Sequence, residues 1–266
     1  MYARKELLVG GQDSQLVNGS EAKKNSLIAP ASRTDANGRA ASNGVLLAIP
    51  DDEFRLLRPN LEFVELPVHK VLYEAGEGIE YAFFLNSGMT SLVIATSDGR
   101  SVEIGVVGKE GFIGGPLAVG LHRSPYRAVM QIPGDGFRVK SEVLERTFNA
   151  TSNLRALLNR CTQILGMQVA QLAACNRLHE IGPRLARWLL MTQDRIESNV
   201  LPITHDFLAQ MLGSGRPTVS LAAGILQKAG IIEYARGIVR ILKRKGLEEA
   251  ACECYAIISQ RFSGCA

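Results

Sequence analysis

Residues 201–242 carry the pattern that most restricts what this 266-residue chain can fold into. The stretch reads LPITHDFLAQMLGSGRPTVSLAAGILQKAGIIEYARGIVRIL. It predicts two short helices, a tight turn and a β-hairpin. The first helix should begin at Thr204, whose hydroxyl can cap a free backbone N–H, and end near Gly213, which can adopt the left-handed conformation of a sharp turn.

The second helix should follow at once, capped by Ser214 or Gly215. Pro217 then falls in its first turn, where proline needs no N–H partner, and Gly230 ends the helix. Its predicted buried face consists of Val219, Ala222, Ala223 and Leu226. Two strands are expected next, over 231–234 and 238–242, joined by a turn at Arg236. Together these elements predict a winged helix-turn-helix.

The start of the second helix presents residues suited to the major groove of DNA. An arginine near a helix N-terminus can donate two bonds to a guanine, and Arg216 is the candidate for this contact. Arg236 at the tip of the hairpin is expected beside a phosphate. The candidate DNA-binding residues are Thr204, Ser214, Gly215, Arg216, Pro217, Thr218, Ser220 and Arg236.

Charge supports a polyanionic partner for this segment. Residues 201–246 contain seven Lys or Arg and two Asp or Glu, whereas the whole chain has a net charge of only +4. The positive charge is therefore concentrated here, as expected for double-stranded DNA as the partner. The alternative is a helix-turn-helix that mainly mediates protein contacts.

Residues 62–140 consist of short β-rich runs separated by glycine or Asp-Gly, a pattern typical of an antiparallel sandwich or barrel. A hairpin is expected at 97–100, and a helix broken at Pro50 precedes the runs, over 45–58. Residues 1–43 are rich in Ser, Asn, Gly, Ala and charge and are predicted to be disordered.

A long helix is predicted over about 151–176, followed by a third helix over 178–195 that contains Trp188. Apolar and small residues recur in the long helix at alternating steps of four and three, which is the spacing of a coiled-coil seam. We expect this seam to pair with a second copy of the chain, and the alternative is packing on the chain's own β domain. The seam residues are Leu154, Leu158, Cys161, Leu165, Gln168 and Leu172.

This order of parts resembles the Crp/Fnr family of regulators, which includes DNA-bending helix-turn-helix dimers. The resemblance rests on LAQMLGSGRPTVSLAAGILQKAGII and on VLYEAGEGIEYAFFLNSGMTSLV followed by GKEGFIGG. It implies an α+β fold and a bacterial, cytoplasmic transcription regulator acting as a homodimer on a near-palindromic site, with RNA polymerase as a further candidate partner. The implied segments are a disordered tail (1–43), a cyclic-nucleotide-binding-like β-roll (44–148), a dimerisation helix (149–177), the winged helix-turn-helix (178–250) and a tail (251–266).

The chain departs from the family at the effector site. The acidic residue that accepts a ribose hydroxyl is missing from Gly114-Gly115-Pro116-Leu117, and neither Arg123-Ser124 nor Arg127 aligns with the phosphate-binding pair. We therefore expect no cyclic AMP, because a buried phosphate without paired donors is costly. An unknown small anionic effector remains open at Gly114, Gly115, Arg123, Ser124 and Arg127, as does a purely structural β-roll.

The cysteines and histidines predict neither a cofactor nor an enzyme. Residues 1–160 contain no cysteine, which argues against an iron–sulfur cluster. Cys252-x-Cys254 has no second close pair in the sequence to complete a tetrahedral metal site, so no metal is expected. The four histidines are scattered singly without a nucleophile, and no apolar run is long enough to span a membrane.

Overall fold

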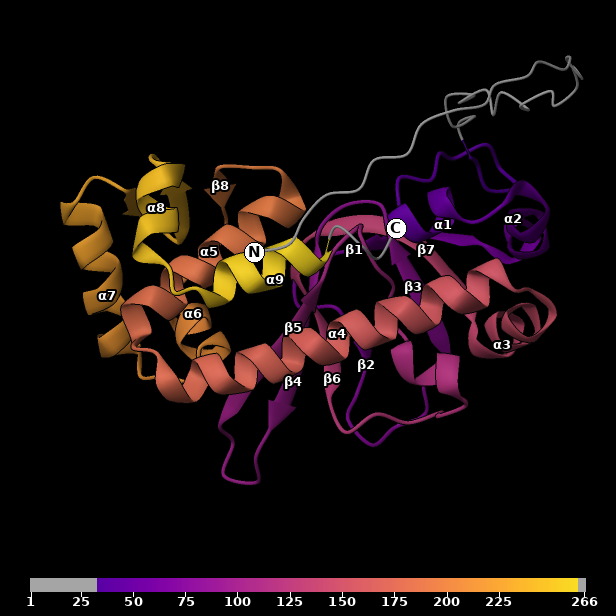
Figure 1. Cartoon of the computed structure of the whole chain (residues 1–266), viewed down its shortest axis with the longest axis horizontal. Coiled ribbons are helices and arrows are strands. Elements are labelled where there is room, and N and C mark those ends of the chain that lie inside the picture. The colour runs from indigo at the N-terminus through magenta and orange to yellow at the C-terminus, as the bar shows by residue number, and fades with distance from the viewer. Residues whose placement is uncertain (1–32, 263–266) are drawn as a thin grey trace, which may run out of the picture. The chain divides into compact units, whose positions relative to one another are not determined.

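The computed structural model describes residues 33–262 of the chain (Figure 1). The first 32 residues of the predicted disordered tail lie outside the described residues. For 33–43 the prediction is wrong, because Thr34 pairs with Ala40 in a β-bridge and Asn43 is fully buried. The Asn43 side chain caps the first helix and donates to the Leu85 carbonyl at 3.0 Å. Polar residues that suggested disorder therefore serve as turn and cap partners.

Helices precede and follow the β domain. The break at Pro50 is confirmed, since it separates two helices and acidic residues open the second. A 3₁₀ turn, Gly115–Val119, connects two strands, and a helix closes the domain. The elements are α1 (Gly44–Ala48), α2 (Asp51–Leu57), η1 (Arg58–Asn60), η2 (Gly115–Val119) and α3 (Ser141–Ala150).

The β domain consists of two antiparallel sheets, as the sequence predicts. One has the strand order β1-β7-β3 and the other β2-β6-β4-β5. The predicted hairpin joins β4 to β5, with Gly99 at φ 82° in its turn. The strands are β1 (Glu62–Leu66), β2 (Val71–Tyr73), β3 (Tyr81–Leu85), β4 (Met89–Ala95), β5 (Ser101–Val107), β6 (Arg127–Ile132) and β7 (Gly134–Lys140).

The long helix α4 (Asn153–Leu178) buries the stripe that was predicted to be the dimer seam. Leu154 and Leu158 are 0% exposed in the single chain, and Leu165 is half-buried. Along its length the stripe packs on η2, on β5 and on the C-terminal helix. The stripe is therefore buried within the chain rather than open to a second copy. Packing on the chain's own β domain is confirmed for its first half, and its second half packs against the C-terminal helices. The buried members are Leu154, Leu158, Cys161, Gln168, Leu172 and Cys175.

The C-terminal half contains the predicted helix-turn-helix and hairpin. A two-stranded hairpin gains a third strand, β8, which the sequence did not predict, in the order β8-β10-β9. The elements are α5 (Ile181–Ile196), β8 (Val200–Leu201), α6 (His205–Met211), α7 (Arg216–Lys228), β9 (Ile232–Ala235), β10 (Ile238–Ile241), α8 (Arg244–Ala250) and α9 (Cys254–Phe262). The prediction of a tail over 251–266 is wrong for most of its length, because α9 forms there and packs against α4 (Figure 1). Residues 263–266 lie outside the described range.

The four-stranded sheet has apolar residues on both faces. One face belongs to the core that α1–α3 and the first half of α4 cover. The other face contributes Met89, Val93, Val106 and Ile132 to the same core as Trp188 and the helix-turn-helix. The β domain and the DNA-binding-type domain are thus packed together rather than joined only through α4. Among residues 33–262, no helix has both the length and the apolar character that crossing a membrane requires.

Candidate nucleic-acid interface

The first helix of the helix-turn-helix is set by local capping. The Thr204 hydroxyl accepts a hydrogen bond from the Phe207 N–H at 3.2 Å, which confirms the predicted cap. Asp206 lies in the first turn, where the helix dipole stabilises a negative charge. The helix ends at Met211, and Gly213 at φ 56° turns the chain as predicted. Thr204 is exposed at this end of the helix.

The turn places the start of α7 at the surface. Gly215 is the cap of α7, and no side chain caps the free N–H groups of its first turn. Pro217 lies in that first turn, as predicted. Gly215, Arg216, Pro217 and Thr218 are exposed, while Ser214 is half-buried. Pro217 has no N–H, and the Thr218 N–H donates to the Gly215 carbonyl at 3.1 Å. The exposed side chains at this end of α7, rather than a set of free N–H groups, therefore give it the chemistry of a DNA-binding helix.

Arg216 lies at the first position of α7 with its side chain 66% exposed. Its Nε is 3.2 Å from Asp206 Oδ1, and both side chains are open to solvent. An exposed ion pair of this kind contributes at most about 1 kcal/mol, so it leaves the guanidinium able to exchange partners. In the free protein the ion pair holds the Arg216 side chain next to the first turn of α6.

Ser220 has an additional role that the sequence did not suggest. Its hydroxyl is 2.9 Å from Nδ1 of His205, and the His205 ring stacks on Tyr234 at 3.8 Å between centroids. His205 thereby joins α6, α7 and the hairpin. Burial lowers the pKa of His205, and the Arg216 guanidinium lowers it further. A neutral His205 therefore helps to fix the orientation of α7 relative to α6 and the hairpin.

Two apolar side chains on α7 are exposed and were not among the predicted contacts. Leu221 is 69% exposed and Ile225 is 62% exposed. They lie four residues apart, and hence on one face of the helix, one turn beyond Arg216 and Pro217. Apolar side chains in a major groove can contact thymine methyl groups. The sequence signal was present, because both residues fall outside the buried positions Val219, Ala222, Ala223 and Leu226.

The hairpin forms the predicted wing. β9 and β10 pair in register, and the turn between them contains Arg236 at φ 51° and Gly237 at φ 79°. Arg236 is exposed at this tip. Not every basic residue nearby is available to DNA, since Arg244 bonds Asp194 at 2.7 Å and Glu248 at 2.9 Å. Arg236 is therefore the wing residue best placed for a phosphate.

Solved structures of regulators share this fold. A Crp/Fnr-family transcriptional regulator from Eubacterium rectale has a TM-score of 0.62 and 18% identity, covering 76% of this chain and 94% of its own. A CRP-family regulator from Thermus thermophilus has a TM-score of 0.59 and 21% identity, covering 71% and 96%. A second Thermus thermophilus regulator, of the CRP/FNR family, has a TM-score of 0.54 and 25% identity, covering 71% and 98%. A search of curated protein sequences gives no significant match.

The sequence of the C-terminal domain identifies that domain. Residues 183–250 match the Crp-like helix-turn-helix domain, and this range contains α6, α7 and the wing. This C-terminal domain belongs to the Crp-like helix-turn-helix family, and the solved regulators share the fold of the larger part of the chain. The chain therefore carries the helix-turn-helix DNA-binding domain of Crp-type transcriptional regulators.

The predicted effector residues have partners within the protein. Arg127 Nη2 is 3.4 Å from Glu74 Oε1, and Arg123 donates to the Gly76 carbonyl at 2.9 Å. Ser124 is buried and accepts a hydrogen bond from the Tyr126 N–H. The five predicted residues do not converge on one pocket, because Gly115 lies against Thr162 of α4 and Gly114 against Ala82.

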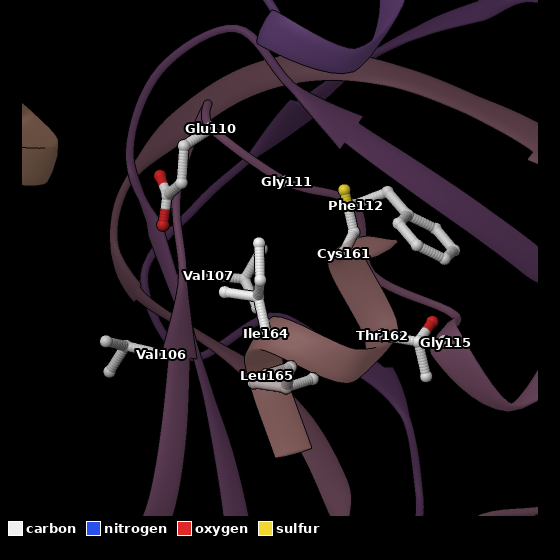
Figure 2. A pocket seen from close by; sticks show the side chains of 10 residues that line it. All are labelled: Val106, Val107, Glu110, Gly111, Phe112, Gly115, Cys161, Thr162, Ile164 and Leu165. Carbon is white, nitrogen blue, oxygen red and sulfur yellow. The ribbon is translucent and has the colours of Figure 1, made fainter. Parts of the chain in front are cut away.

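A small space lies between the β-roll and α4 of the Crp/Fnr fold (Figure 2). It measures about 20 Å³, which is room for about one water molecule. Its walls are mainly apolar, with Ile164 beside Val107, and Glu110 stands at one side (Figure 2). Val106 also lines the space, but its side chain points away from Ile164 (Figure 2). Of the predicted effector residues, only Gly115 lines it.

Proposed function

We propose that the chain is a sequence-specific regulator whose α7 enters the major groove and whose Arg216 recognises a guanine. The observation that carries this proposal is the exposed Arg216 guanidinium at the first position of the second helix of the helix-turn-helix. On binding, Arg216 leaves Asp206 and Arg236 of the wing contacts the adjacent backbone.

We infer further that two copies bind together on a near-palindromic site. α4 carries a second stripe with steps of four and three, on the face away from the core: Asn159, Gln163, Gly166, Ala170 and Ala173, all exposed. Small residues here allow a second helix to approach closely, and a Cβ added at Gly166 meets nothing within 4 Å. This outward stripe replaces the buried one as the candidate dimer face.

The β-roll is proposed to work without cyclic AMP. Arg123 and Arg127 are engaged by Gly76 and Glu74, and the space that Gly115 lines is far smaller than a nucleotide. Thermal melting with cyclic AMP and a panel of other anions tests this point. We expect no rise of the midpoint with cyclic AMP, and a rise of several degrees would contradict the proposal.

Selection of bound sequences from a random DNA pool by the full chain tests recognition and symmetry together. We expect an inverted repeat with half-sites about one helical turn apart and a salt-dependent affinity. A selected site without two-fold symmetry, or no enrichment, would contradict the proposal. In parallel, light scattering should show that Gly166→Arg converts a dimer to a monomer. Gly182→Arg, at another helical glycine with open space, should remain dimeric.

A second candidate function is supported by Leu221 and Ile225, which expose apolar surface on the presented face of α7. Such a surface suits a protein partner as well as a groove. The same selection separates the two, because a helix-turn-helix used for protein contacts enriches no sequence.

A further inference from the structure

Four metal-ligating side chains that are distant in the sequence come together behind the helix-turn-helix. Cys175 lies in the last turn of α4, and His179 caps that helix. Cys252 follows α8, and Cys254 begins α9. The three sulfur atoms and a ring nitrogen of His179 all lie within 4.8 Å of one another. The sequence contains a second close pair, Cys175-x₃-His179, which the prediction of no metal site overlooked, and the fold brings it beside Cys252-x-Cys254.

The distances fit the edges of a tetrahedron around one ion. Cys175 Sγ is 3.5 Å from Cys252 Sγ, and Cys254 Sγ is 3.6 Å from His179 Nδ1. With Zn–S bonds of about 2.3 Å and Zn–N bonds of about 2.0 Å, a tetrahedral centre separates two sulfur atoms by about 3.8 Å and a sulfur from a nitrogen by about 3.5 Å. The four ligands therefore need only small movements to enclose an ion.

We propose that Cys175, His179, Cys252 and Cys254 bind a single Zn²⁺ ion in a closed structural site. Three thiolates and an imidazole are a ligand set that zinc prefers. The three cysteines are buried, which leaves no open position for a substrate and argues for a structural rather than a catalytic ion. An iron–sulfur cluster fits less well, because a cluster places several atoms between its ligands, and these four are gathered around one point.

The groups around the ligands support this assignment. Glu253 Oε1 is 3.2 Å from His179 Nε2, so the carboxylate can orient the imidazole while Nδ1 faces the sulfur atoms. Gln171 donates its amide N–H to Cys254 Sγ at 3.1 Å. Both contacts are of the kind that fix metal ligands in place.

Positive charge on α5 offsets the charge of the proposed site. Arg187 is buried, its Nε has no hydrogen-bond partner among the described residues, and it interacts electrostatically with Cys175. Three thiolates on one Zn²⁺ leave a net charge of −1, and a buried guanidinium needs a nearby negative group. The carboxylate of Glu103 already interacts with Arg187, and the metal thiolates would add to it.

The ion would link the end of α4, the segment after α8 and the start of α9. α4 ends and α5 begins at His179–Ile181, where the helix of the β-roll leads into the DNA-binding domain. Bound zinc would hold the start of α9 against this junction and thus stabilise the packed arrangement of the two domains. This stabilisation does not depend on which DNA sequence is bound.

Metal analysis of the full chain tests the proposal. Protein purified without chelator should contain about one zinc per chain. After chelation, Zn²⁺ should raise the melting temperature, and Co²⁺ should give the visible absorption of a tetrahedral thiolate complex. Less than one-tenth of an equivalent of zinc, together with no shift on adding Zn²⁺, would overturn the proposal. So would a Cys175–Cys252 disulfide in freshly isolated protein, or the absorption of an iron–sulfur cluster.

Variants locate the site. Cys254→Ser should abolish stoichiometric zinc, and Glu253→Gln should weaken binding by about 10–100-fold without removing a ligand. His122→Ala removes an exposed histidine that pairs with Glu145 and should keep full zinc content. If Cys254→Ser does not fold, Glu253→Gln still tests the proposal. An unchanged zinc affinity in that variant would count against the assigned geometry.

Discussion

The indole N–H of Trp188 in α5 donates a hydrogen bond of 2.9 Å to Glu103 in β5. Glu103 is 4% exposed and also accepts a hydrogen bond from the Ser91 hydroxyl. Nearby, Arg195 of α5 pairs with Glu110 at 2.8 Å, and Lys109 pairs with Glu197 at 2.6 Å. These polar contacts join the β-roll directly to the DNA-binding domain, so a change in the sheet can reach α6 and α7 without passing along α4.

The contribution of Glu103 to stability should depend on pH. Burial raises the pKa of Glu103 to about 7, against the opposing effects of Ser91, Arg187, Trp188 and Arg195. In the unfolded chain the group has its ordinary value of 4.5. The folded protein therefore binds the proton more tightly, and the contribution of Glu103 to stability is full below pH 4.5 and is lost as pH rises toward 7.

Glu103→Gln should remove that dependence. The amide keeps an acceptor for Trp188 and cannot ionise, so this part of the pH slope disappears. Between pH 4.5 and about 7 the free energy of unfolding of the native chain should fall by about 3 kcal/mol, at about 1.4 kcal/mol per pH unit. Urea denaturation at several pH values should show the variant to be the more stable protein above pH 7. An equally steep slope in both proteins would exclude a buried, titrating Glu103.

Leu158 tests which face of α4 is buried within the chain. Leu158→Ala should lower the free energy of unfolding by about 2–5 kcal/mol, because it leaves a cavity in the β-roll core. Gln163→Ala, on the exposed face, should change it by less than about 0.5 kcal/mol. The difference should persist at protein concentrations where light scattering finds only monomer. If it vanished there, Leu158 would belong to the dimer interface first predicted.

Arg236 should contribute to affinity but not to sequence preference. Arg236→Ala removes one phosphate contact, so the slope of log K against log salt should fall by about 0.9 while relative affinities for variant sites stay the same. Fluorescence anisotropy over a series of salt concentrations measures both quantities. Loss of discrimination between sites would instead place Arg236 against a base.

The helix-turn-helix could be predicted in detail because its signals are local. Thr204, Gly213 and Pro217 act within one or two turns of their own positions, and the observed helices begin and end where these residues require. The exposed pair Leu221 and Ile225 could be found by the same reasoning, since they are what remains after the buried face is assigned.

The wrong predictions have a common physical cause. The repeat in α4 shows that a stripe containing Leu158 is apolar, but it does not identify the surface that covers the stripe. The metal ligands Cys175 and Cys252 lie 77 residues apart, so only the fold reveals them as neighbours. The same holds for Glu103 and Trp188, which are 85 residues apart.

Binding of the native chain and of Arg216→Ala to the selected DNA site, and to single-base variants of that site, tests recognition by α7 most directly. Arg55→Ala, an exposed arginine in α2, serves as the charge-matched control. We predict that Arg216→Ala loses about 1–3 kcal/mol of discrimination at one base pair of each half-site and none elsewhere. The Arg55 variant should behave as the native chain does. Unchanged discrimination at every position in Arg216→Ala would contradict recognition by the N-terminus of α7.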